Sequence, residues 1–175
     1  MKKVGVTLAL VLSLVVVVQP AAAGEAFFKG GYFFSPSSLG DAGDKWFVAL
    51  GSDYDLSDVG YLGFEIQGAY RSNTVPGVAS LKTIPVNALV TGKWKMDREK
   101  IRPFAGGGLG LVSAVVRTSS QTPLLASNTT YVRNAGIQLQ GGAEFNDKWL
   151  AEFVGQRSFA TGAQWSWGFA GGLRW

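Results

Sequence analysis

The 175-residue chain contains no cysteine and no histidine. Without cysteine it can form no disulfide framework and no thiolate metal site, and it has no thiol nucleophile and no lipidated N-terminal cysteine. Without histidine it lacks the side chain that most often serves as general base and as metal ligand near neutral pH. These absences argue against catalysis, and we expect no cofactor and no metal site.

The first 23 residues have the pattern of an export signal. Lys2 and Lys3 precede an apolar run at 4–18, and three alanines end at residue 23, which matches a charged region, an apolar region and a small-residue cleavage site. The apolar run is shorter than the ~20 residues that a membrane-spanning helix needs. We expect a cleaved signal peptide, 1–23, and a mature domain, 24–175, whose 14 basic and 12 acidic residues predict no nucleic-acid partner.

The mature sequence shows no helical period of useful length but alternates with a period of two. In one segment Leu62, Phe64 and Ile66 are separated by Gly63 and Glu65, so one face is apolar and the other is small or polar. Turn-rich stretches separate the alternating segments, and about 150 residues suit one domain. The sequence predicts eight strands, at 26–34, 45–54, 60–71, 82–95, 101–117, 131–145, 149–159 and 164–175.

Alternation alone does not decide whether the apolar faces meet a soluble core or lipid. The aromatic residues favour lipid, because they gather near both ends of the expected strands with aliphatic residues and glycine between them, as two membrane interfaces require. The last strand also ends on an aromatic residue. One rim is predicted to hold Tyr54, Tyr61, Trp94, Phe104, Phe145, Trp149 and Trp175, and the other Tyr32, Phe34, Trp46, Tyr70, Tyr131, Phe159 and Trp165.

The connections between the expected strands support the same conclusion. Three of the four odd connections are long, at 35–44, 72–81 and 118–130, whereas the even ones are short. Outer-membrane barrels have long external loops and short periplasmic turns. The sequence therefore predicts an all-β fold, an eight-stranded antiparallel up-and-down transmembrane β-barrel.

The polar faces of these strands would point into a lumen that side chains nearly fill. Charges in such a dry interior must be paired or hydrogen-bonded. We predict a network of ion pairs and amides that stabilises the barrel; a narrow path for water or ions would use the same residues. The predicted lumen polar network consists of Lys29, Glu65, Gln67, Arg71, Asn87, Lys93, Gln138, Gln140, Glu144, Glu152, Gln156 and Arg174.

Four pieces of the sequence resemble the small eight-stranded outer-membrane barrels, a family that includes the outer-membrane protein A transmembrane domain, outer-membrane protein X and the neisserial opacity-type proteins. They are the leader ending in three alanines, the strand RPFAGGGLG at 102–110, the strand end GGAEF at 141–145 and the aromatic-terminated last strand. The resemblance implies a place in the bacterial outer membrane, contact with its lipids and lipopolysaccharide, and insertion by the barrel assembly machinery. The assembly signal would be Trp167, Phe169, Leu173 and Trp175, although the family usually ends in phenylalanine.

We expect a monomer with a structural or surface-interaction role and no catalysis. The alternatives are a narrow channel for small or apolar solutes, resembling the outer-membrane protein W family, and a lipid A-modifying barrel enzyme. In place of a histidine base, such an enzyme would need a Ser-Lys pair or a carboxylate arrangement, for example Glu65, Glu144 or Glu152 with a nearby serine. If the apolar faces pointed inward, the chain would be a soluble lipocalin-like binder.

Overall fold

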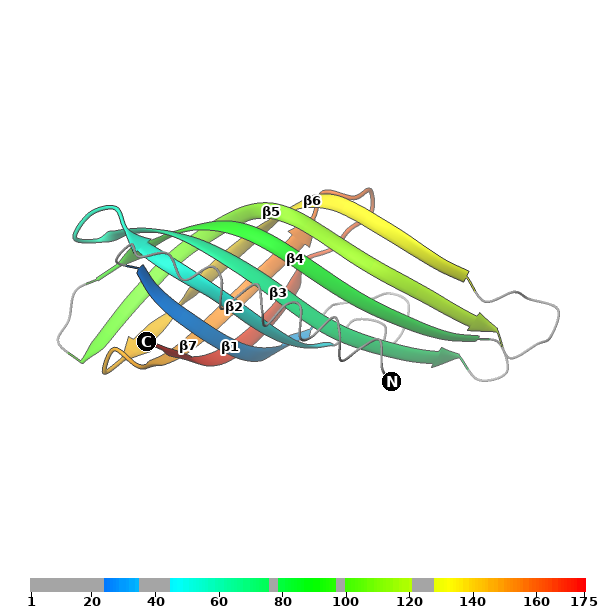
Figure 1. Ribbon diagram of the computed structural model, residues 1–175, viewed down its shortest axis with the longest axis horizontal. Helices are drawn as coiled ribbons and strands as arrows, with labels where there is room; N and C mark the ends of the chain where they lie inside the picture. The colour runs from blue at the N-terminus through cyan, green and yellow to red at the C-terminus, as the bar shows by residue number, and fades with distance from the viewer. Residues whose placement is uncertain (1–23, 35–44, 76–78, 97–99, 121–127) are drawn as a thin grey trace.

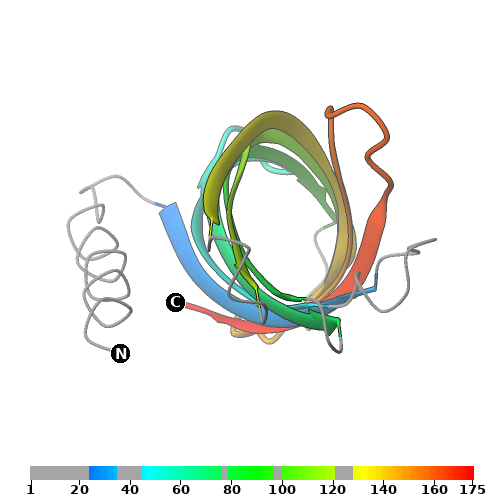
Figure 2. The same ribbon diagram turned by 90° about the vertical axis from the view of Figure 1, so that its right-hand side faces the viewer.

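The structure, a computed structural model, is a closed barrel in which eight strands follow one another in chain order. It describes residues 24–34, 45–75, 79–96, 100–120 and 128–175, and the predicted signal peptide lies outside these ranges. All neighbouring strands are antiparallel, and pairing of the first strand with the last closes the ring (Figure 2). The predicted fold class is confirmed. The strands are β1 (Gly24–Phe34), β2 (Lys45–Asp55), β3 (Gly60–Val75), β4 (Ala79–Lys95), β5 (Ile101–Ser120), β6 (Asn128–Phe145), β7 (Trp149–Ser158) and β8 (Ser166–Arg174).

The four middle strands are much longer than the others. β3 to β6 have 16 to 20 residues, whereas β1, β2, β7 and β8 have 9 to 11. The excess lies at one end, called here the loop end, where β3 to β6 continue past their neighbours (Figure 1). The opposite turn end holds the connections β2–β3, β4–β5 and β6–β7. Much of the predicted connections 72–81 and 118–130 is therefore strand, because polar, threonine-rich residues still pair when both neighbours continue.

Within the residues that the structure describes, no helix is long and apolar enough to cross a membrane.

The apolar faces of the strands point outward. Leu109, Leu111 and Phe169 each keep 60% of their surface exposed, whereas Leu89 and Val154 on the opposite face are fully buried. Exposed apolar side chains continue around all eight strands, which is far beyond the isolated patches of a water-soluble monomer. Such a surface is stable when acyl chains cover it.

Aromatic side chains border this apolar surface at both ends. Phe34, Trp46, Tyr70, Tyr131 and Phe159 are exposed toward the loop end, and Trp94, Phe145, Trp149 and Trp175 toward the turn end. The prediction is wrong for two rings, which lie on the inner face. Phe104 is buried, and its ring centroid is 5.9 Å from the Lys93 Nζ. The Tyr61 ring centroid is 3.7 Å from the Lys95 Nζ. Both rings occupy inward positions in the alternation of their strands. The alternation therefore turns them into the lumen although they lie near the rim.

Two inward glycines bring neighbouring strands close together. A Cβ on Gly110 would meet the Ala88 carbonyl oxygen and lie 2.8 Å from the Leu89 Cα, and a Cβ on Gly142 would meet the backbone of β7. Only glycine permits this close approach, which the curvature of a small barrel requires.

The tight β6–β7 turn depends on its two polar residues. Asn146 and Asp147 have φ values of 50° and 57°, and asparagine and aspartate tolerate this left-handed region better than most residues do.

Candidate functional site

The structure buries eleven of the twelve predicted lumen residues inside the barrel. The twelfth, Arg71, lies in β3, but its side chain falls outside the described residues. Among the residues whose burial the structure describes, three buried polar residues were not predicted: Asp53, Thr91 and Lys95. The period of two contains a signal for each, since Thr91 and Lys95 flank Lys93 on one face, and Asp53 continues the inward positions of β2. The buried predicted residues are Lys29, Glu65, Gln67, Asn87, Lys93, Gln138, Gln140, Glu144, Glu152, Gln156 and Arg174.

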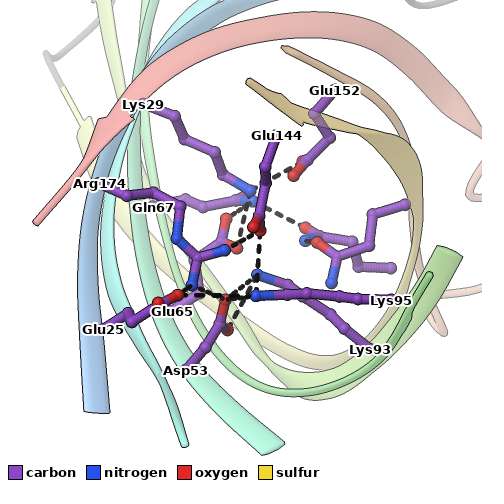
Figure 3. A network of polar contacts seen from close by, with 12 residues as sticks. Glu25, Lys29, Asp53, Glu65, Gln67, Lys93, Lys95, Glu144, Glu152 and Arg174 are labelled. Carbon is purple, nitrogen blue, oxygen red and sulfur yellow. Dashed lines mark hydrogen bonds and ion pairs between the residues drawn. The ribbon is translucent and has the colours of Figure 1, made fainter. Parts of the chain in front are cut away.

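A buried ion triad occupies the middle of the lumen. The Lys29 Nζ lies 2.8 Å from the Glu65 Oε2 and 2.7 Å from the Glu152 Oε1, and all three side chains are 0% exposed. The residues come from β1, β3 and β7, so the triad joins opposite walls (Figure 3). One ammonium group thus pairs with two carboxylates in a site without solvent.

Four amide side chains form a layer beside the triad. Gln67 donates to Glu65 and to the Gln138 Oε1, the latter at 2.7 Å. Asn87 donates to the Gln156 Oε1 at 3.0 Å, and Gln156 donates to the Gln67 Oε1 at 2.9 Å. An amide both donates and accepts, so the four can interlock without a net charge. The layer ties β3, β4, β6 and β7 together across the lumen.

A second ion cluster closes the lumen at the turn end (Figure 3). The Asp53 carboxylate accepts from the Lys93 Nζ at 2.9 Å and lies 3.2 Å from the Arg174 guanidinium. The Glu144 carboxylate lies 3.0 Å from the Lys95 Nζ and also pairs with Arg174. Three cations therefore meet three carboxylates, and the charges balance. The members of this cluster are Glu25, Asp53, Lys93, Lys95, Glu144 and Arg174.

Apolar side chains cover the triad on its loop-end side. The rings of Phe33 and Phe47 are 4.5 Å apart between centroids, and they pack with Ala49, Val154 and Ala170 in one buried cluster. Phe33 follows Lys29 by four residues on β1, so this layer lies directly beyond the triad. From the turn end, the ion cluster is followed by the triad, and the amide layer and the apolar layer both lie on the loop-end side of the triad. The carboxylates of the lumen are already paired with cations.

Among the described residues, no group of three or more aspartates or glutamates is arranged to hold a metal ion.

The closed eight-stranded ring, the lipid-type exterior and the polar interior define a small transmembrane β-barrel of the bacterial outer-membrane type. Solved structures of this class have a similar fold. Neisserial surface protein A has 15% sequence identity and a TM-score of 0.60, covering 89% of this chain and 98% of that one. The Yersinia pestis attachment invasion locus protein Ail, bound to the heparin analogue sucrose octasulfate, has 11% identity and a TM-score of 0.58, covering 87% and 96%.

The N-terminal barrel domain of Pseudomonas aeruginosa OprF has 11% identity and a TM-score of 0.51, covering 86% of this chain and 97% of that domain. At these identities the likeness shows the fold. No family model and no curated protein matches the chain.

Proposed function

We propose that residues 24–175, released from a signal peptide at 1–23, form a monomeric outer-membrane barrel with a plugged lumen. It stabilises the cell envelope and presents its loop end for interactions at the cell surface, without catalysis. The observation that carries this proposal is the triad of Lys29, Glu65 and Glu152, which is sealed from solvent on every side.

The layered interior supports a plug in preference to a pore. An ion crossing the lumen would have to break the Lys29 pairs and separate the packed Phe33 and Phe47 rings. Breaking a buried ion pair costs about 3–5 kcal/mol, and the amide layer would have to open as well. The carboxylates that a barrel enzyme would need as a base are held by Lys29, Lys95 and Arg174.

The shape of the loop end supports a role in surface interactions. There β3 to β6 extend beyond the aromatic rim as a partial cylinder (Figure 1), which a plug alone does not require. Extended strands on a rigid barrel can contact a partner without disturbing the fold. Ail, which has a similar fold, was solved with a sulfated ligand.

The last strand supports insertion by the barrel assembly machinery. Trp167, Phe169 and Leu173 lie exposed on the outer face of β8, and Trp175 is exposed directly after it. Another protein can bind these side chains before the barrel closes against β1.

The plug predicts that the reconstituted protein does not conduct ions. We expect residues 24–175 in a planar lipid bilayer to show no stepwise current, with folding confirmed by a different gel mobility before and after boiling. The triple variant Lys29→Ala, Glu65→Ala, Glu152→Ala removes both the charges and the volume of the triad, and we expect it to raise the current. Stepwise conductance by the unaltered protein would overturn the plug and favour the channel.

A further inference from the structure

The inner face of the barrel becomes apolar at the loop end, whereas most buried lumen residues are polar. Asn87 of the amide layer pairs with Val112 on β5, and the next inward positions of β5 toward the loop end are Ala114 and Val116. Val132, an inward position of β6, keeps 41% of its surface exposed. The interior of an outer-membrane barrel that opens to water is polar, so an uncovered apolar face there indicates a ligand site.

Strand register arranges this inner face, called here the loop-end face, in two rows beyond the amide layer. The rows are Pro85, Ala114 and Val132, and Thr83, Val116 and Thr130. All these side chains are small or β-branched, so they do not fill the lumen as the larger residues below them do. β1, β2, β7 and β8 end before this level (Figure 1). The loop-end face is therefore open on the side of the short strands.

A cation lies at the base of the loop-end face. The Lys45 Nζ is 5.3 Å from the centroid of the Phe33 ring, and Phe33 belongs to the apolar layer that covers the triad. Lys45 begins β2, two residues farther toward the loop end than Phe47, so its ammonium group is on the loop-end side of that layer. Arg71 pairs with Thr83 in register and adds a second positively charged residue to this end of the barrel.

The described residues provide no carboxylate on this side of the amide and apolar layers. Glu65 and Glu152 are buried beneath these layers and paired with Lys29, and the other described carboxylates belong to the turn-end cluster or to the turns beside it. A carboxylate from outside could form a charge-assisted hydrogen bond with Lys45. A positive base beside an apolar wall is thus complementary to an amphipathic anion.

We propose that the loop-end face binds one free fatty acid, whose carboxylate pairs with Lys45 and whose acyl chain lies along the two rows. A ring of eight strands has room for one small ligand, which favours a single acyl chain over a phospholipid with two. This inference rests on the plugged lumen of the proposed function, because the plug closes the site beneath Lys45. The fatty acid is therefore held at the cell surface and does not cross the barrel.

The first test locates the bound chain. Residues 24–175 in phosphatidylcholine nanodiscs are irradiated with a dodecanoate that carries a photoreactive diazirine at its chain end, and the labelled residues are identified by mass spectrometry. We expect labelling at Ala114, Val116 and Val132, reduced by excess unlabelled dodecanoate. Labelling confined to outward side chains such as Leu109 and Leu111, or labelling that the excess does not reduce, overturns the inference.

A pair of variants tests the apolar wall without changing its shape. The concentration of unlabelled dodecanoate that halves the labelling gives the affinity. Val116→Thr with Val132→Thr is expected to bind at least about tenfold more weakly, because two hydroxyl groups would be covered by the acyl chain without partners. The matched control, Val86→Thr with Val90→Thr, makes the same change at exposed outward positions and is expected to keep its affinity. Equal affinity of the two variants overturns the acyl site.

The role of Lys45 is tested with two ligands that differ in the headgroup. Lys45→Gln is expected to weaken the binding of dodecanoate about tenfold, because a charge-assisted contact is lost, and to leave the binding of dodecanol unchanged. Unchanged dodecanoate binding, or an equal loss for both ligands, overturns the pairing of the carboxylate with Lys45. A chain that forms no heat-modifiable barrel, or a barrel that conducts ions, contradicts the proposed function itself, whereas a folded, non-conducting barrel without these differences contradicts only the fatty-acid site.

Discussion

Replacing Lys29 with methionine is expected to lower the free energy of unfolding by about 3–5 kcal/mol, because it leaves two buried carboxylates without a cation. The Lys29 Nζ is within 2.8 Å of both Glu65 and Glu152, and none of the three side chains is exposed. Methionine keeps much of the length and volume of lysine, so the change tests charge more than packing. The measurement is equilibrium unfolding by urea from lipid vesicles, followed by tryptophan fluorescence.

The rescue variant decides whether charge is the cause. Adding Glu65→Gln and Glu152→Gln to Lys29→Met removes the uncompensated charges while keeping the shapes, and buried ion pairs replaced as a unit often cost little. We expect the triple variant to recover most of the lost stability. Lys100→Met, at an exposed turn position, is the control and should change stability by less than about 0.5 kcal/mol. A Lys29→Met protein as stable as this control would show that the triad does not hold the lumen together.

Replacing Leu109 with arginine is expected to destabilise the folded protein in a bilayer by about 2–4 kcal/mol, because a charge on the lipid face near the membrane midplane loses its hydration. Leu109 is 60% exposed and lies on β5 within the apolar band. In water an exposed leucine would tolerate this change, so the size of the effect reports the surroundings of the side chain. The same unfolding measurement in lipid vesicles gives the value.

Leu56→Arg is the matched control for the lipid face. Leu56 is 68% exposed but lies in the β2–β3 turn, outside the strands, so arginine there stays hydrated and should change stability by less than about 0.5 kcal/mol. Equal, small effects at both positions would mean that the outer wall of the barrel faces water.

The strands and their faces could be predicted because each depends on a local pattern. Alternation along β3 places Phe64 and Glu65 on opposite faces of the sheet independently of the rest of the chain. The same reasoning placed Lys29, Gln138 and Glu152 inside the barrel. The sorting of aromatic residues then distinguished an inverted barrel from a soluble one, because only a membrane has two interfaces.

The partners of each lumen residue could not be predicted, because they depend on the closed ring. Lys29 meets Glu65 and Glu152, which lie 36 and 123 residues away in sequence, and only the combined register of eight strands brings them together. Phe104 and Tyr61 were misplaced for a related reason. Their position near a rim suggested a lipid interface, but the pleat turns each ring inward beside Lys93 and Lys95.

The orientation of the two faces is tested most directly by spin labels on single cysteines placed along β3 from 62 to 69 in lipid vesicles. The native chain has no cysteine, so each label reports one site. We predict that accessibility to oxygen alternates with a period of two and is highest at Leu62, Phe64, Ile66 and Gly68, as in the hydrocarbon of a membrane. High oxygen accessibility at the intervening positions instead, or no alternation at all, would contradict an apolar exterior around a polar lumen.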